Sequence, residues 1–435
     1  MATQAWAKTE GESRTIEAGG VSPPAGSRAM KHLRPFIVFG TRPEAIKLAP
    51  VVLECRRSKD GLDPIVCLTG QHRELLQQAV EHFGLTHDLY LDVMVPRQTL
   101  AEMTARCVEL LDRALLRFQP DCVVAQGDTT TVMAASMAAF YRRIPFVHVE
   151  GGLRTGDLRA PWPEEFNRRV ASLTAALHCA STRRAADQLL LEGVPAGRVR
   201  VTGSPVIDAL HWTLARMRSY ASRWEQKYGD LGDRRMVLIT GHRRESFGRG
   251  FEQICGAIRR LAGDLPDVAF VYPVHPNPRV RETVHARLCD LPNVRLEPPL
   301  PYPEFVWLMQ RSTLILTDSG GVEEEAPTLR KPLVVMRETT ERWEVVDAGA
   351  AIVTGVCEAR IVAAVRRLLA DEEAYRRMQL DRNPYGDGQA AARIVQLLSR
   401  ECWAADDTDG AGAPASPAGE ACRRALDDAA WALPD

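Results

Sequence analysis

Short apolar runs alternate with longer helical segments along most of this 435-residue chain, and this alternation limits the possible folds more than any other feature. The runs form two series, at 35–39, 64–68, 122–125, 146–149, 177–179 and 199–201, and at 236–240, 268–273, 294–296, 314–317, 333–336 and 351–353. Strands that are apolar on both faces and separated by helices are typical of parallel sheets covered on both sides. We therefore expect an α/β protein with two doubly wound domains that face each other across a cleft.

The composition changes at the two ends of the chain, where small and polar residues dominate and no apolar periodicity remains. Such segments cannot bury enough apolar surface to offset the conformational entropy that folding removes. The predicted division is a disordered tail at 1–32, a first domain at 33–203, a second domain at 204–385, a C-terminal helix at 386–403 that returns to the first domain, and a disordered tail at 404–435. Among the predicted helices are 100–118, 206–228 and 358–369.

Charge and cysteine content exclude several classes of protein. The 55 Lys and Arg residues balance 56 Asp and Glu residues, and the net charge of −1 does not favour nucleic-acid binding. No apolar run reaches the roughly 18 residues of a membrane span, and the first thirty residues lack the apolar core of a secretory signal. The ten cysteines are scattered without a Cys-x-x-Cys pair, which indicates reduced thiols and neither a disulfide framework nor a zinc site. We expect a cytoplasmic enzyme or binding protein.

The turn after the first strand, Phe39–Lys47, has the features of an anion site. Gly40 allows a tight turn out of the strand, and Pro43 suits the first turn of the next helix. Arg42 and Lys47 beside a helix N-terminus would attract a phosphate. A plain strand–helix turn with solvated charges remains the alternative. The turn lacks the Gly-x-Gly-x-x-Gly of dinucleotide folds and the Gly-Lys-Ser/Thr of a P-loop, so NAD and ATP are disfavoured.

Three acidic residues follow successive strands of the first series. Asp128 comes after the third strand, where it could also be a simple N-cap, and Glu150 ends the fourth. Pro163 opens the next helix, which puts Glu164 in its first turn and Arg168 one turn later on the same face. Carboxylates that lie close together push their proton affinities apart, so one can act as an acid while another acts as a base. This set is a candidate acid–base site.

A histidine ends the first strand of the second series. His242 in the stretch TGHRRE is a candidate acid–base group or phosphate partner, with a structural histidine in a turn as the alternative. An Asp-x-Asp pair occurs only at 407–409 in the predicted C-terminal tail, where we interpret it as solubilising charge. No other segment resembles a site for a diphosphate-bound metal.

The stretch LTDSGGVEEEAP has the pattern of a metal-free diphosphate site. Ser319 can cap a helix, and Gly320 and Gly321 expose its first backbone N–H groups. Glu325 lies one to two turns further and could accept hydrogen bonds from ribose hydroxyls, while Arg342 offers another phosphate contact. Carboxylates would repel a diphosphate, so those of the first domain should face an uncharged sugar. This distribution of charge favours a nucleotide-sugar site.

At these residues the sequence resembles the non-hydrolysing UDP-N-acetylglucosamine 2-epimerases of bacteria. The resemblance covers roughly residues 33–400 and rests on FGTRPEAIKLAP, TGQHRELL, QGDTTT, HVEGGLRTGDLRAPWPEEFNRR, TGSPVIDAL, TGHRRESFGRGF, PVHPNP, LTDSGGVEEEAP and TTERWE, in that order. It implies the GT-B arrangement of two Rossmann-like domains, which agrees with the strand pattern, and it implies no cofactor. It also implies a homodimer.

The resemblance further implies a reaction and a set of residues. UDP leaves by anti elimination across C1–C2 to give 2-acetamidoglucal, and then re-adds while C2 is protonated on its opposite face. The acid–base carboxylates would be Asp128, Glu150 and Glu164, with His242 assisting loss of UDP. The substrate-binding residues would be Arg42, Lys47, Arg168, Phe305, Ser319, Gly320, Gly321, Glu325 and Arg342. A second, activating UDP-GlcNAc would bind Gln71, Glu74, Arg97, Arg243 and His275, with Glu164 shared.

Some positions depart from the family pattern. They are Gly151 for the usual Ala, Ser204 for Asn, Glu323 for Gln, Trp343 for Pro, Leu300 for a polar Gln of some relatives, and Glu74 for Gln in the activator site. The turn GTRPEAIK differs from the GTRADYG-type turn of hydrolysing relatives, which favours reversible interconversion of UDP-GlcNAc and UDP-ManNAc for polysaccharide synthesis. The alternatives are a glycosyltransferase on the same fold, an epimerase for a diacetamido uronate sugar, and a non-catalytic UDP-sugar sensor.

Overall fold

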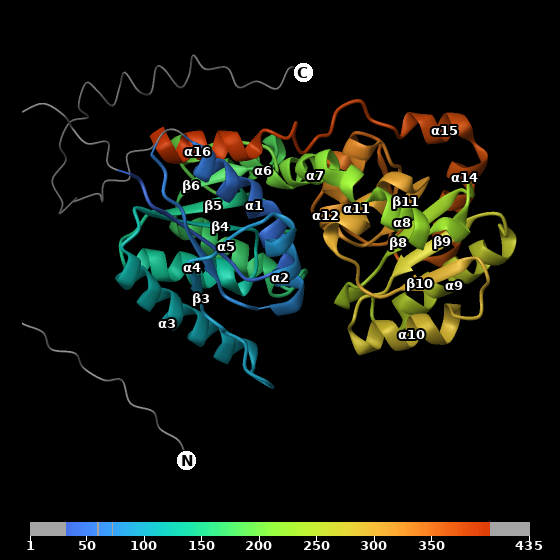
Figure 1. The fold of residues 1–435 in the computed structure, drawn as a ribbon, viewed down its shortest axis with the longest axis horizontal. Helices are drawn as coiled ribbons and strands as arrows, with labels where there is room; N and C mark the ends of the chain where they lie inside the picture. The colour runs from blue at the N-terminus through green and yellow to red at the C-terminus, as the bar shows by residue number, and fades with distance from the viewer. Residues whose placement is uncertain (1–31, 59–60, 72, 401–435) are drawn as a thin grey trace, which may run out of the picture.

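The computed structural model describes residues 32–58, 61–71 and 73–400, which form two α/β halves that lie side by side (Figure 1). The predicted disordered tails, residues 1–32 and 404–435, lie outside the described residues except for His32. None of the helices in the described ranges is long and apolar enough to cross a membrane.

The first half is built on a seven-stranded parallel sheet with the strand order β3-β2-β1-β4-β5-β6-β7. In that order the strands are Leu89–Tyr90, Ile65–Leu68, Pro35–Phe39, Cys122–Gln126, Phe146–Gly151, Ala175–Ala180 and Val199–Val201. The six predicted strands are confirmed, but β3 was not predicted because its two residues are too short to show a pattern. The helices of this half are α1 (Arg42–Arg57), α2 (Arg73–His82), α3 (Leu100–Phe118), α4 (Thr130–Tyr141), α5 (Glu164–Thr174) and α6 (Arg183–Leu191).

The second half contains a six-stranded parallel sheet with the order β10-β9-β8-β11-β12-β13. In that order the strands are Val294–Glu297, Ala269–Pro273, Met236–Thr240, Leu314–Thr317, Leu333–Val335 and Ala351–Val353, and all six were predicted. The helices are α9 (Arg249–Asp264), α10 (Pro278–Leu288), α11 (Tyr302–Arg311), α12 (Gly320–Glu325), α13 (Trp343–Asp347), α14 (Glu358–Ala370) and α15 (Glu372–Arg377). The α/β class with two doubly wound sheets is therefore confirmed.

The helix predicted at 206–228 is interrupted. It divides into α7 (Pro205–Arg216), a 3₁₀ turn at Met217–Ser219, and α8 (Ala221–Lys227). The Ser219 hydroxyl donates to the Arg216 carbonyl at 2.7 Å, and such local hydrogen bonds compete with those of a continuing helix. The prediction of one long helix was wrong because apolar periodicity persists across the break.

Helix α7 connects the two halves. It packs against α1 of the first half and against α11 and α12 of the second. The C-terminal helix α16 (Ala390–Arg400) also packs on α1 and α7, so the end of the described chain returns to the first half (Figure 1). The Asp208 carboxylate of α7 accepts the N–H groups of Ala390 and Ala391 at 3.1 and 2.9 Å, which satisfies donors at the start of α16.

Local sequence explains how the first strand turns into α1. Thr41 is the N-cap, and the Glu44 carboxylate accepts the N–H groups of Gly40 and Thr41 at 2.8 Å each. A Cβ atom on Gly40 would lie 1.9 Å from the Thr69 hydroxyl, so the turn has no room for a side chain there. This turn brings the start of α1 close to the carboxyl end of β2.

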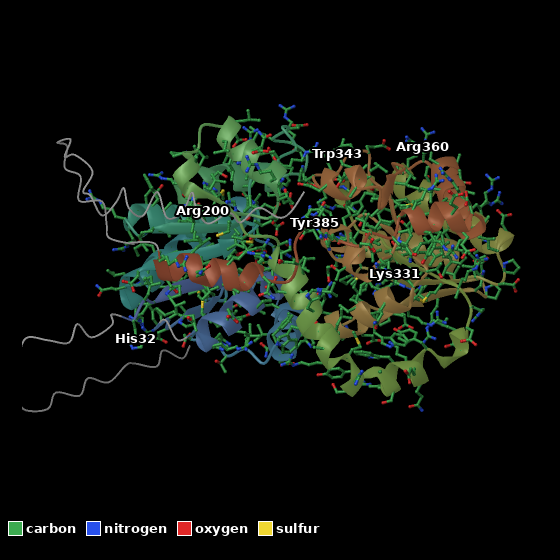
Figure 2. All side chains as sticks on the ribbon, turned by 90° about the horizontal axis from the view of Figure 1, so that it is seen from above. His32, Arg200, Lys331, Trp343, Arg360 and Tyr385 are labelled. Carbon is green, nitrogen blue, oxygen red and sulfur yellow. The ribbon has the colours of Figure 1, made fainter. Side chains whose placement is uncertain are left out.

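The chain crosses between the halves a second time after α15. The Ser204 N–H donates to the Tyr385 carbonyl at 2.7 Å, which joins this second crossing to the first one at α7. The Tyr385 side chain is buried, and it lies with Trp343 where the halves meet, whereas Arg200 lies within the first half, away from the interface (Figure 2). Both crossings therefore lie beside the interface that holds the candidate site.

Candidate active site

The carboxyl ends of β4 and β5 place two of the predicted carboxylates. Asp128 follows β4 and keeps 32% of its side chain exposed, whereas Glu150 lies within β5 and keeps 4%. The N-cap of α4 is Thr129, so the N-cap interpretation of Asp128 was wrong by one residue. Glu150 has a φ of 64°, a left-handed conformation that is uncommon for a residue with a side chain. Such strain is concentrated at functional sites, which is consistent with a functional role for Glu150.

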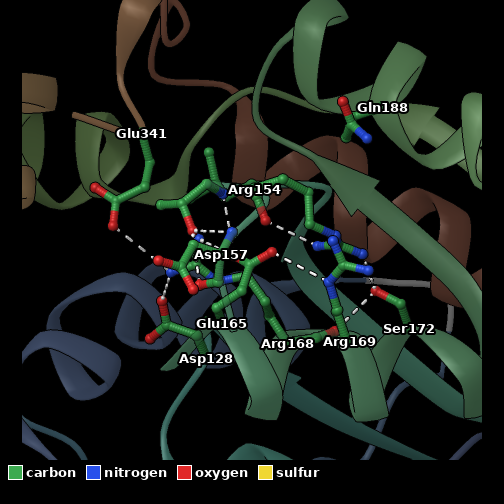
Figure 3. A network of polar contacts seen from close by, with 12 residues as sticks. Asp128, Arg154, Asp157, Glu165, Arg168, Arg169, Ser172, Gln188 and Glu341 are labelled. Carbon is green, nitrogen blue, oxygen red and sulfur yellow. Dashed lines mark hydrogen bonds and ion pairs between the residues drawn. The ribbon is translucent and has the colours of Figure 1, made fainter. Parts of the chain in front are cut away.

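Arg168 of α5 joins the first half's carboxylates to the second half. Its guanidinium donates to Asp128 at 2.5 Å, lies 3.4 Å from Glu165, and lies 3.9 Å from Glu341 of the second half (Figure 3). The i,i+4 spacing suggested an ion pair with Glu164, but none forms between these two residues in the described structure. Asp128 attracts Arg168 more closely because the two side chains converge from neighbouring strand and helix ends.

Glu164 begins α5 and is half-buried beside Asp128. Burial raises the pKa of Glu164, the negative charge of Asp128 raises it further, and Arg243 and Arg168 oppose the shift. A carboxyl group with a raised pKa can hold a proton near neutral pH and act as an acid. The structure thus brings Asp128 and Glu164 together, and their acid–base roles stay a prediction.

Glu150 belongs to a buried set of four charges that we call the interdomain charge cluster: Lys47, Glu150, Glu324 and Arg342. Lys47 of α1 forms an ion pair with Glu150 and lies 3.2 Å from Glu324 of α12. Arg342 lies 2.6 Å from Glu324 and donates to Glu150 at 3.2 Å. Two residues come from each half and their charges sum to zero, so each buried charge has an opposite partner from the other half.

Neighbouring side chains complete the interdomain charge cluster. The Gln126 amide donates to Glu150 at 2.6 Å, and the Ser204 hydroxyl donates to Glu324 at 2.8 Å. Burial alone would raise the pKa of Glu324, but Lys47 and Arg342 outweigh it and hold that pKa below its usual value. Sequence analysis did not select Glu324, because it is one of three consecutive glutamates and only the fold shows which one meets the cations.

The start of α12 has the geometry of the predicted diphosphate site, with one correction. Ser319 is the N-cap residue, but its side chain makes no capping hydrogen bond, contrary to expectation. Gly320 and Gly321 are the first two helical residues. A Cβ atom on Gly320 would lie 2.4 Å from the Arg342 guanidinium, so glycine is what allows Arg342 to lie against the helix start.

The predicted ribose partner, Glu325, ends α12 and is buried. The Tyr302 hydroxyl donates to its carboxylate at 2.6 Å. Burial raises the pKa of Glu325 to about 8, and the negative charge of Glu324 contributes to the shift. Phe305 of the same helix as Tyr302 is partly buried against the core, where it could meet a base or ribose.

Arg42 and His242 approach from opposite halves. Arg42 donates to the Leu300 carbonyl at 3.0 Å. Leu300, which differs from the Gln of some relatives, therefore contacts the first half through its backbone. His242 follows β8, and its ring stacks on His275 with centroids 5.2 Å apart and planes at 14°. Burial lowers the pKa of His242, as do the charges of Arg243 and Arg42.

The predicted activator residues come from both halves. Gln71 accepts a hydrogen bond from Thr131 at 3.4 Å, Glu74 is in the first turn of α2, and Arg97 occupies a loop with a φ of 63°. Arg243 and His275 lie beside His242 in the second half. The activator role of these five residues stays a prediction.

The other departures from the family pattern lie in different surroundings, and only that of Gly151 has a steric explanation. A Cβ atom on Gly151 would lie 3.0 Å from His178 and 3.4 Å from His148, so glycine relieves crowding between these buried rings. Glu323 is buried, accepts from the Thr340 hydroxyl at 2.7 Å, and has its pKa raised by burial. Trp343 begins α13 and is 39% exposed.

Across residues 32–58, 61–71 and 73–400, no group of three or more His, Cys, Asp or Glu side chains is placed to hold a metal ion. The eight cysteines in these ranges form no disulfide bond with one another.

Comparison with known proteins identifies relatives over most of the chain. A sequence model of the family described as UDP-N-acetylglucosamine 2-epimerase matches residues 53–399. A relative from Yersinia pestis named UDP-N-acetylglucosamine 2-epimerase is 49% identical over 370 residues, which are 84% of this chain and 98% of the relative.

Solved structures agree with the sequence match. The crystal structure of a UDP-GlcNAc 2-epimerase from Neisseria meningitidis bound to UDP-GlcNAc superposes with a TM-score of 0.83 and 43% identity, covering 85% of this chain and 100% of that chain. The Methanocaldococcus jannaschii enzyme in complex with UDP-GlcNAc and UDP gives a TM-score of 0.76 and 30% identity over 84% of this chain and 99% of that one. The similarity therefore extends over both halves.

The raised pKa of Glu325 predicts a pH-dependent stability. Its pKa is about 8 in the folded protein against an ordinary value of 4.5, so the folded state holds this proton more tightly than the unfolded state. The resulting stabilisation is complete below about pH 4.5 and is lost as the pH rises through 8. Between pH 5 and 8, the free energy of unfolding of Glu325→Gln should fall less steeply than that of the wild type, by up to about 1.4 kcal/mol per pH unit.

Urea denaturation at several pH values would measure the two slopes. Glu81→Gln on the surface of α2 is the control, since Glu81 is exposed and its removal should leave the slope unchanged. Equal slopes for the wild type and Glu325→Gln would contradict the prediction.

Proposed function

This chain belongs to the UDP-N-acetylglucosamine 2-epimerase family, and from that membership we propose how its two halves divide the reaction. It is an enzyme of the isomerase class with UDP-GlcNAc 2-epimerase activity. The finer proposal is that UDP is eliminated from C1, that 2-acetamidoglucal stays bound, and that UDP re-adds after C2 has been protonated on the opposite face. The product, UDP-ManNAc, would supply cell-surface polysaccharide synthesis from the cytoplasm.

One observation carries this proposal: carboxylates and cations of both halves meet at a single interface. Arg342 lies against Gly320 at the start of α12 and also hydrogen-bonds Glu150 at the end of β5. Arg168 links Asp128 to Glu341 in the same region. A sugar diphosphate bound here would have its sugar near acids and its phosphates near cations.

The proton balance of the reaction needs acid–base groups on both faces of C2. In the elimination, a carboxylate takes the C2 proton, the C1–O bond breaks, and UDP leaves with the bonding electrons. In the return step, a carboxylic acid on the other face gives a proton to C2 while UDP attacks C1. We propose Asp128 and Glu164 for these two roles, because the two side chains lie close together, burial raises the pKa of Glu164, and Arg168 holds Asp128 in place.

Glu150 is the third proposed acid–base carboxylate, and its surroundings differ from those of the other two. Its carboxylate contacts Lys47, Gln126 and Arg342 and is almost fully buried. In this arrangement it orients the two cations, and a sugar reaches it only if one of these contacts opens.

The UDP moiety would lie against the second half. We propose that Arg42 and Lys47 of the first half, together with Arg342 and the backbone N–H groups of Gly320 and Gly321, bind the diphosphate, as cations and the amides at a helix start favour anions. Ser319 would contact the diphosphate through its hydroxyl, since its N–H already donates to the Thr317 hydroxyl at 2.9 Å. Glu325 would accept hydrogen bonds from the ribose, and Phe305 would contact the nucleoside. His242 would donate a hydrogen bond or a proton to the departing phosphate.

Hydrogen exchange at C2 tests the proposed elimination. In D₂O and without any acceptor, the enzyme should incorporate deuterium at C2 of the sugar while UDP-GlcNAc and UDP-ManNAc interconvert. Proton NMR of the reaction mixture measures the loss of the C2 signal. Retention of protium at C2 during turnover would reject the mechanism, and a glycosyltransferase would consume UDP-sugar only when an acceptor is added.

Two substitutions test the assigned roles. Asp128→Asn should lower kcat by about 10²–10⁴-fold, since it removes an acid–base group. His242→Asn should lower it on the order of 10²–10³-fold if His242 stabilises the departing charge. Asp290→Asn is a matched control, because Asp290 also pairs with an arginine at 2.5 Å but lies on the surface of the second half. Near-wild-type turnover in either test variant would remove its role.

We propose a homodimer that uses an apolar groove on the first half. Side chains from α3, α4, α5 and the segment before α5 line this groove, whose volume is about 1080 Å³. Its large side chains include Tyr141, Trp162 and Phe166, which are 64%, 59% and 50% exposed. Apolar surface of this extent favours coverage by another chain, and the family resemblance favours a second copy of this one.

Sedimentation equilibrium would test the dimer. The wild type should sediment at about twice the 48.2 kDa chain mass. Phe166→Glu should shift it to the chain mass, because it puts a charge into the groove, whereas Leu191→Glu on α6 should not, since Leu191 is 82% exposed outside the groove. A monomeric wild type would refute the proposal.

A further inference from the structure

Asp318 is a buried carboxylate that the proposed reaction does not yet use. It directly follows β11 and has no exposed surface. One oxygen, Oδ2, accepts the backbone N–H groups of His242 at 2.7 Å and Arg243 at 2.8 Å. The N–H of Asp318 in turn donates to the Thr240 carbonyl at 3.1 Å. Asp318 therefore anchors the turn that carries His242 to the neighbouring strand end.

The second oxygen of Asp318 faces the His242 ring. Oδ1 lies 3.3 Å from His242 Nδ1, and among the described residues it has no hydrogen-bond partner with good geometry. A buried carboxylate oxygen without a donor is unfavourable, because it has lost its hydrogen bonds to water. If His242 carries a proton on Nδ1, that N–H can donate to Asp318 Oδ1 after a small rotation of the ring.

We propose that Asp318 is a positioning residue that keeps a proton on His242 Nδ1 and so leaves Nε2 as the nitrogen that exchanges a proton with the departing diphosphate. This inference rests on the proposed role of His242 in the loss of UDP. As the C1–O bond breaks, the proton on Nε2 moves to, or hydrogen-bonds, the phosphate oxygen that receives the electron pair. On re-addition Nε2 takes the same proton back.

The surroundings of His242 make this partner necessary. Arg42, Arg243 and Arg337 all place positive charge near the ring and disfavour its protonation, and His275 stacks on one face of the ring. The negative charge of Asp318 opposes these arginines. A bound diphosphate would add negative charge on the other side, so the ring could hold a proton on each nitrogen between two anions.

The substitution Asp318→Asn reverses the direction of the hydrogen bond between residue 318 and His242 Nδ1. An asparagine oxygen can still accept the two backbone N–H groups, while its NH₂ group faces Nδ1 and requires that nitrogen to be an acceptor. The proton of the neutral ring then moves to Nε2, and the doubly protonated ring loses its anionic partner. We expect kcat to fall by no more than the loss in His242→Asn, on the order of 10²–10³-fold, with a much smaller change in KM, because the lost interaction acts in the transition state.

Nitrogen-15 NMR of the histidine rings measures the tautomer directly. In protein labelled with ¹⁵N-histidine, long-range ¹H–¹⁵N spectra of the wild type with UDP absent should show His242 protonated at Nδ1 when neutral. Asp318→Asn should show it protonated at Nε2. The His242 signals are assigned by their loss in His242→Asn.

Two further variants separate positioning from a structural effect. Asp208→Asn makes the same chemical change at a carboxylate that also accepts two backbone N–H groups, at 3.1 and 2.9 Å, but in α7. It should leave kcat and the His242 tautomer unchanged. The double variant Asp318→Asn/His242→Asn should be no slower than His242→Asn alone, whereas independent structural damage would multiply the two losses.

The outcomes distinguish this inference from the proposed function. The inference is overturned if the neutral His242 ring of the wild type is protonated on Nε2. It is also overturned if Asp318→Asn keeps the wild-type kcat. Full activity of His242→Asn removes the catalytic role of His242 and the inference with it, whereas the tautomer measurement would still report the Asp318 contact. The wild-type spectrum alone tests the tautomer if Asp318→Asn fails to fold.

Discussion

The interdomain charge cluster is the interaction on which the rest of the site depends. Lys47 and Glu150 come from the first half and Glu324 and Arg342 from the second, and all four are almost fully buried. Burying a charge is very unfavourable unless an opposite charge and hydrogen bonds replace water. Because each carboxylate here is neutralised by cations from both halves, the cluster is stable only when the two halves meet in this arrangement.

That requirement explains why the candidate site contains both carboxylates and cations. The same contacts that neutralise Glu150 and Glu324 hold Arg342 against the start of α12. Arg168 pairs with Asp128 and lies 3.9 Å from Glu341 of the second half. The proposed acid–base carboxylates and the proposed diphosphate-binding cations are thereby held at one interface. Asp318 extends this logic, since another buried carboxylate anchors the turn that carries His242.

Sequence patterns predicted most of the framework and several of the site residues. Twelve of the thirteen strands have a clear apolar pattern, whereas β3 is too short to have one. The break after Arg216 was missed because a hydroxyl-to-carbonyl hydrogen bond decides it and the apolar period continues. Residues at strand ends, such as Asp128 and His242, were found because parallel strands gather their carboxyl ends at one edge. Glu324 was missed because it is one of three consecutive glutamates, and Asp318 because only the fold shows that its carboxylate faces the turn of His242.

The sequence by itself determined the two parallel sheets, the turns at their carboxyl ends and the residue types in those turns, because strand periodicity and turn chemistry are local. The tertiary structure alone decided which charges pair. Lys47 meets Glu324 across 277 residues and Arg342 meets Glu150 across 192, separations over which no local pattern reports contact. Those pairings depend on how the two halves pack, since a buried charge is stable only beside the partner that the fold provides.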